Sequence, residues 1–219
     1  MTDFFRVDWA IDHLDDVWLA FQEHLWLTFL AVTIGFLISF PIAVLAHRRR
    51  WVYGTSIAVA GILYTIPSLA LLAALVPFTG LSTLTAEIAL VSYTFLILIR
   101  NIVTGLNEVP RDTIEAAEGM GFSRRQLLWR VQLPLALPAI VAGLRIATVT
   151  TIGLVTVTAL IGKGGLGSLI YLGLIRTFST AIVLGAALSL LLAVAADFLL
   201  IRVERLMSPW ARRRGGATA

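Results

Sequence analysis

The sequence contains no cysteine and few charged residues, and both absences limit what the protein can be. Without cysteine it forms no disulfide bond and carries no thiolate chemistry. Charged residues make up 14% of the 219 residues, whereas soluble domains carry about a quarter. The sequence also lacks a phosphate-binding loop, a cluster of metal ligands and a nucleophile beside a base. We therefore expect no catalytic residue, no metal site and no cofactor bound by this chain.

Hydrophobic residues make up 58% of the chain and are collected in long uncharged runs. A helix needs about 20 apolar residues to cross a hydrocarbon core of about 30 Å. The longest run contains Pro67 and Pro77, so we expect it to form one span at 53–76 followed by an outer loop. The sequence predicts an all-α membrane protein with five transmembrane helices, at residues 25–46, 53–76, 84–106, 146–162 and 177–196.

The basic residues predict how these spans are oriented. Six acids and one Arg precede the first span, three consecutive Arg follow it, and further Arg lie between the third and fourth spans and in the tail at 203–219. Because Lys and Arg accumulate on the cytoplasmic side of short loops, we expect segment 1–24 outside and the tail in the cytoplasm. Topology explains the net charge of +4 without a nucleic-acid partner, and the tail is suited to contact anionic membrane lipid.

Residues 162–167, "GKGGLG", fit the spacing of a dinucleotide-binding turn. Such a turn requires a strand before it, a helix after it and an acid about 20 residues further on. Here the motif follows a membrane-length run on the predicted outer side, and the next acid is Asp197, in another span. Two interpretations remain. The segment is a flexible turn, or Gly164 and Gly165 let chain segments approach closely at an outer gate.

The longest polar interruption between spans is predicted to face the cytoplasm and to form two short helices. Gly119 and Gly121 are expected to stop the first helix. Ser123 followed by Gln126 forms a capping box that starts a second helix, which Pro134 is expected to end. The two helices would project from the membrane with a sharp bend. The alternative is an amphipathic loop that lies on the bilayer.

Three ionisable side chains lie within predicted spans or directly at their ends, where a charge is costly and suggests a function. We expect a buried partner or a polar cavity around Arg100, because its side chain leans away from the cytoplasm. Arg145 is expected near the inner headgroups, either as an interfacial anchor or in transmitting motion of the loop. Asp197 lies near the same surface and has three candidate partners, Arg100, Arg145 and Arg202.

Pro67 is predicted to kink the second span, because proline removes one helical hydrogen bond. Two interpretations are open. The kink is purely structural, or it is a break that faces a pore, with the hydroxyl groups of Thr65 and Ser68 beside a translocation path.

The polar loop resembles the EAA-x3-G-x9-I-x-LP signature of bacterial ABC importer membrane subunits, with Val131 in place of the usual Ile. The resemblance implies an importer-permease (MetI-like) fold in which this loop docks into a groove on an ATPase subunit. The implied permease domain covers residues 25–202, with a coupling loop at 107–134. The residues implied in coupling are Glu115 as a polar anchor, Ala116 and Ala117 as a close-packing surface, Gly121 as the turn, and Leu133 with Pro134 at the end of the signature.

The segments 64–75, 133–153 and 161–174 are similar to the osmoprotectant branch of this family, which transports glycine betaine, choline and carnitine. The resemblance implies a bacterial inner-membrane protein. Its implied partners are cytoplasmic ATP-binding subunits that hold ATP and Mg²⁺, a second permease subunit, identical or related, and an extracytoplasmic substrate-binding protein. The alternatives are a permease for another zwitterion such as an amino acid, a stand-alone ion-coupled transporter, and a membrane scaffold.

Overall fold

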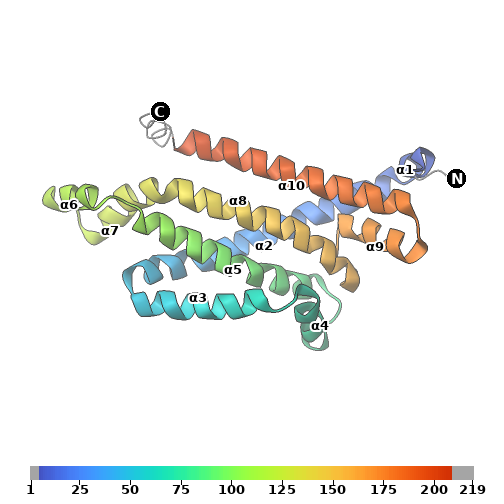
Figure 1. Cartoon of the computed structure of the whole chain (residues 1–219), viewed down its shortest axis with the longest axis horizontal. Coiled ribbons are helices and arrows are strands. Elements are labelled where there is room, and N and C mark those ends of the chain that lie inside the picture. Colours follow the sequence, from blue (N-terminus) through green and yellow to red (C-terminus); the bar gives the residue numbers. More distant parts are fainter. Residues whose placement is uncertain (1–4, 209–219) are drawn as a thin grey trace.

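The computed structural model describes residues 5–208, and every regular element in that range is helical (Figure 1). Four helices are long and apolar enough to cross a membrane, and a fifth span results if one bent helix pair is counted as a unit. The elements are α1 Val7–Asp12, α2 Leu14–Arg48, α3 Arg50–Thr65, α4 Ser68–Thr79, α5 Thr83–Asn107, α6 Arg111–Gly119, α7 Arg124–Leu127, a π-helical turn Leu128–Gln132, α8 Leu133–Val157, a 3₁₀ turn Thr158–Ile161, α9 Leu166–Arg176 and α10 Ser179–Met207.

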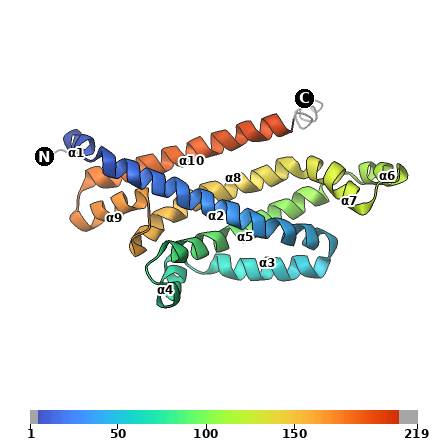
Figure 2. The same ribbon diagram turned by 180° about the vertical axis from the view of Figure 1, so that it is seen from behind.

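Helix α5 is the centre of the bundle. It packs against α2, α8 and α3, and its side chains form most of the largest core cluster with those of α2 and α8. Helix α2 crosses behind α5 and α8 in Figure 1 and in front of them in Figure 2, whereas the opposite face of both helices is open in Figure 1. Helices α6 and α7 lie at one end of the bundle, the α6 end, and α1, α4 and α9 lie at the other, the α4 end.

Small residues bring the central helices close together. A Cβ atom added to Gly35 of α2 would lie 2.0 Å from Thr94 Oγ1 of α5. One added to Gly143 of α8 would lie 2.5 Å from Asn101 Cβ of α5. Membrane helices gain packing energy through such close contacts because lipid offers no hydrophobic force between them. Gly143 therefore brings α8 directly against α5.

The predicted first and fifth spans are shorter than the observed helices, and α8 begins at Leu133, well before the predicted fourth span at 146–162. Helix α2 begins at Leu14, so part of the segment at 1–24 belongs to the first long helix. Helix α10 continues to Met207, beyond the predicted end of the fifth span. In both cases the added turns carry charged residues on exposed positions, so they lie outside the uncharged runs. Helix α9, in the link between the fourth and fifth spans, was not predicted at all.

The predicted kink at Pro67 is present, but the bend is much larger than a kink within one helix. Helix α3 ends at Thr65 and α4 starts at Ser68, with an angle of 93° between them. The residue before a proline avoids the helical region, and Ile66 is extended with φ −66° and ψ 127°. The chain therefore turns aside at this point, and the predicted span at 53–76 is divided into two helices.

The prediction that Pro134 ends the second loop helix is also wrong. Helix α7 runs through the π-helical turn into α8, and Pro134 lies in the first turn of α8. In the turn before it, the N–H of Leu133 bonds to the carbonyl of Leu128, five residues back. This wider turn accommodates a residue that has no N–H and whose ring would crowd a regular helix. The loop is consequently continuous with a membrane helix.

Candidate functional sites

Helix α6 extends beyond the ends of α5 and α8 and forms the tip of the α6 end (Figure 1). Glu115 and Ala116 are exposed on it, whereas Ala117 is 2% exposed and packs within this chain. Gly121 closes the helix with φ +84°, a conformation that glycine adopts without strain. The surface open to a partner is thus made by Glu115 and Ala116, and Ala117 supports it from below.

The predicted capping box between the two loop helices is confirmed. The Ser123 N–H donates to Gln126 Oε1 at 2.8 Å, and the Gln126 N–H donates to Ser123 Oγ at 3.4 Å. These reciprocal bonds satisfy two free backbone donors at the start of α7. A groove of about 570 Å³ next to them is lined by Ser123, Arg125, Gln126, Trp129 and Arg130. The loop therefore has a defined shape and a basic, aromatic flank.

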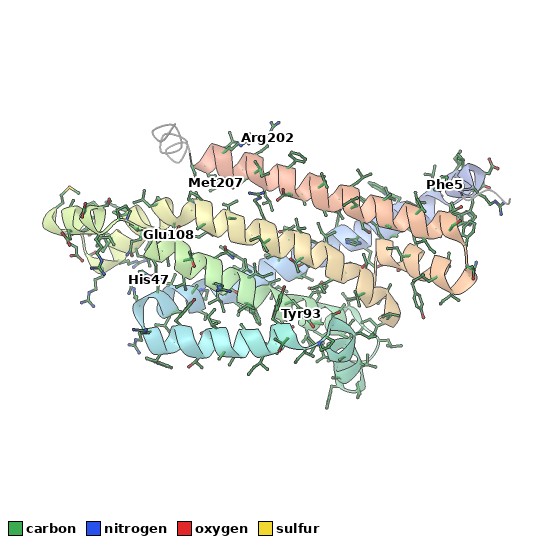
Figure 3. All side chains as sticks on the ribbon, in the orientation of Figure 1. Phe5, His47, Tyr93, Glu108, Arg202 and Met207 are labelled. Atoms are coloured by element: carbon green, nitrogen blue, oxygen red, sulfur yellow. The ribbon has the colours of Figure 1, made fainter. Side chains whose placement is uncertain are left out.

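A polar contact that the sequence did not reveal joins the loop to two membrane helices. His47, near the end of α2, is bonded through Nδ1 to Asn107 Oδ1 of α5 at 2.7 Å. Its Nε2 lies 3.5 Å from Nε2 of Gln132, a buried residue of the π-helical turn. Figure 3 shows His47 at the α6 end. Leu133 and Pro134 follow directly and are half-buried, so they belong to the joint between loop and bundle.

Asp197 pairs with Arg145, one of the three partners that the sequence allowed. Arg145 Nε donates to Asp197 Oδ1 at 2.8 Å, and Nη2 donates to Oδ2 at 3.2 Å. Its Nη1 also lies 3.5 Å from Glu204 Oε2. Glu204 was not among the predicted partners, although it follows Asp197 by two helical turns and so lies on the same face of α10. This ion triad connects α8 with α10 beside a groove of about 750 Å³.

Arg100 does not have the buried partner or polar cavity that the sequence predicts. Its side chain is exposed on α5, and within residues 5–208 it forms no ion pair or hydrogen bond. A partner for Arg100 was expected within this chain, on the assumption that each intramembrane charge is paired inside the chain that carries it. Arg100 instead lies on the face of α5 that this chain leaves open.

The glycine-rich segment is tightly packed, which excludes the interpretation as a flexible turn. Gly164 and Gly165 are buried, and the Gly165 N–H donates to Glu23 Oε2 at 3.2 Å. A Cβ atom at Gly165 would lie 2.6 Å from the backbone nitrogen of His24. Close approach of two chain segments, one of the two interpretations, is confirmed here between the glycine segment and α2. Whether these glycines form a gate stays a prediction.

We expect Gly165→Ala to lower the stability of the protein more than Gly162→Ala. Both glycines have positive φ, of +50° and +74°, so both substitutions introduce backbone strain of about 1–2 kcal/mol. At Gly165 the new methyl group also clashes with α2, while at Gly162 nothing lies within 4 Å. Overpacking typically adds about 1–3 kcal/mol. Thermal unfolding in detergent measures the difference, and equal melting temperatures would contradict the tight packing.

Thr65, Pro67 and Ser68 lie together at the bend between α3 and α4. The Thr65 hydroxyl donates to Ile62 O of its own helix at 2.8 Å, and the Tyr93 hydroxyl donates to Ile66 O. Tyr93 approaches the bend from α5 (Figure 3). Helix α4 also contacts the 3₁₀ turn that precedes the glycine segment. The two groups of predicted path or gate residues thus share the α4 end, and their role in transport is untested.

Three comparisons with known proteins extend over most of the chain. Residues 19–212 match the family of binding-protein-dependent transport system inner membrane components. The chain is 36% identical over 192 residues to the choline transport system permease protein OpuBB of Bacillus subtilis (strain 168), covering 88% of each protein. It is 35% identical over 187 residues to the glycine betaine/carnitine/choline transport system permease protein OpuCB of the same strain, covering 85% of this chain and 86% of that protein.

The fold is similar to that of a chain of the MetNI methionine ABC transporter in an inward-facing conformation. The TM-score is 0.78 at 27% sequence identity, covering 87% of this chain and 96% of that chain.

Proposed function

Because the chain belongs to the family of binding-protein-dependent transport system inner membrane components, we propose that it is the permease subunit of an ATP-driven importer for quaternary-ammonium osmoprotectants. The proposed solutes are choline, glycine betaine and carnitine, which are named for relatives at 35–36% identity. The chain is a transport component of the inner membrane and not an enzyme. ATP and Mg²⁺ would be held by partner ATPase subunits.

The observation that carries this proposal is the exposed α6 and its firm connection to the bundle. Glu115 and Ala116 face outward from α6, and the His47 contacts with Asn107 and Gln132 tie the adjoining turn to α2 and α5. A force applied to α6 by a closing ATPase would be transmitted directly into α8, because α7 continues into that helix. This arrangement suits a lever that converts movement outside the membrane into movement within it.

The remaining partners follow from the same proposal. The basic α6 end would face the cytoplasm, and the acidic N-terminal end would face an extracytoplasmic substrate-binding protein. The open face of α5 and α8 would meet a second permease subunit, since five helices are too few to enclose a path. A permease for an amino acid is the second candidate, because the fold resembles that of a methionine transporter.

Uptake by the reconstituted importer tests the proposal. The permease is assembled with its ATPase and binding protein in liposomes, and radiolabelled choline, glycine betaine, carnitine and methionine are offered. We expect accumulation of the quaternary-ammonium solutes only when ATP and Mg²⁺ are present on the ATPase side. Uptake of methionine alone would favour the second candidate. Solute uptake by this chain without ATPase, driven by an ion gradient, would contradict an ABC permease.

A further inference from the structure

The open face of α5 carries one charged side chain at membrane depth, that of Arg100. The most deeply buried neighbours on this helix are Leu98 and Ile102, both 0% exposed and both in the core shared with α2. Each is two residues from Arg100, or about 200° around the helix at 3.6 residues per turn. Arg100 therefore points away from this core, and its side chain is exposed.

Arg100 also lies well inside the predicted membrane segment. Helix α5 ends at Asn107, so Arg100 is about 10 Å from that end at 1.5 Å per residue. Its side chain leans toward the N-terminus of the helix, which is deeper into the membrane. A guanidinium in contact with lipid at this depth costs several kcal/mol. Such a residue persists where it faces a water-filled or protein-lined path, and Thr104, exposed one turn further along, continues this polar strip.

We propose that Arg100 lines the translocation path and recognises the carboxylate of zwitterionic quaternary-ammonium solutes. This inference rests on the proposed function, in which the open face meets a second permease subunit. A guanidinium offers paired N–H donors that match a carboxylate, and it repels a solute that carries only an ammonium group. Arg100 thus favours passage of glycine betaine and carnitine over choline, which has no carboxylate.

The test compares solutes that differ in the carboxylate. Initial rates of ATP-driven uptake of glycine betaine and of choline are measured in liposomes for Arg100→Gln and Arg100→Lys, each with saturated binding protein. For Arg100→Gln we expect glycine betaine uptake to fall about tenfold, equivalent to about 1.4 kcal/mol. Choline uptake is expected to be unchanged or to rise. Arg100→Lys keeps the charge but loses the paired donors, so its glycine betaine rate should lie between those of the unsubstituted protein and of Arg100→Gln.

Arg202→Gln is the matched control, because Arg202 is exposed on α10 at the outer edge of the bundle (Figure 3). It should leave both rates unchanged. The proposal is overturned if glycine betaine and choline uptake fall together in Arg100→Gln, if neither falls, or if Arg100→Lys is as impaired as Arg100→Gln. Failure of the unsubstituted importer to take up either solute would contradict the proposed function itself, so the two failures are distinguishable.

Discussion

Replacing Glu115 by Lys is expected to abolish ATP-driven uptake while leaving the protein inserted in the membrane. Glu115 is exposed at the tip of the bundle and forms no hydrogen bond or ion pair within the described part of the chain, so its substitution should spare the fold. In a docked interface the reversed charge costs several kcal/mol, because a site that accepts a carboxylate repels an ammonium group. We expect loss of at least about a hundredfold in uptake and loss of ATPase co-purification.

Two further variants separate docking from a general effect of charge. Gly121→Leu should also abolish uptake, because Leu cannot hold φ +84° without strain and the angle between α6 and α7 would change. Asp12→Lys makes a similar charge change on exposed α1, at the opposite end of the bundle, and should leave ATPase co-purification intact. Normal uptake by both Glu115→Lys and Gly121→Leu would remove the docking role from the loop.

Asp197→Ala is expected to destabilise the protein, since it leaves Arg145 without the carboxylate that accepts two of its hydrogen bonds. The effect should be smaller than for a fully buried ion pair, because the Arg145 and Asp197 side chains are 28% and 36% exposed. Thermal unfolding in detergent should show the loss as a lower melting temperature. The backbone amides of α10 should also exchange their hydrogens faster, because α10 is held less firmly against α8.

A double replacement shows whether the ion triad mainly stabilises the fold or also transmits motion between α8 and α10. Arg145→Met combined with Asp197→Leu removes both charges and keeps the volume, so it should recover most of the stability that Asp197→Ala loses. If the double variant is as unstable as the single one, the two residues are not coupled. A stable double variant with impaired uptake would assign the triad a part in transmitting motion between α8 and α10.

The helical class and the loop helices could be predicted because they depend on local chemistry. An uncharged run of sufficient length indicates a span, because the hydrocarbon core of the bilayer excludes water and charge. The capping box depends only on Ser123 and Gln126, which are three residues apart. The continuation through Pro134 could not be predicted in this way, since it depends on a wider turn whose hydrogen bonds shift by one residue. The right-angle bend at Pro67 likewise depends on how α4 packs across α5.

Partners of intramembrane charges were predictable only in part. Periodicity places Asp197 and Glu204 on one face of α10, but nothing in the sequence says that α8 lies against that face. For Arg100 the sequence predicted a partner that the described part of the chain does not contain. Its expected partner does not exist within the described residues, because the face that carries it is left open by this chain.

Accessibility of a cysteine introduced at Glu118 tests most directly whether the α6–α7 loop is a cytosolic handle for an ATPase. The chain has no cysteine of its own, so Glu118→Cys is a single reporter on an exposed position of α6. A membrane-impermeant thiol reagent should label it in inverted vesicles but not in right-side-out vesicles, and the assembled ATPase should protect it. Labelling from the external side alone would contradict the orientation, the docking role and the proposed mechanism of coupling.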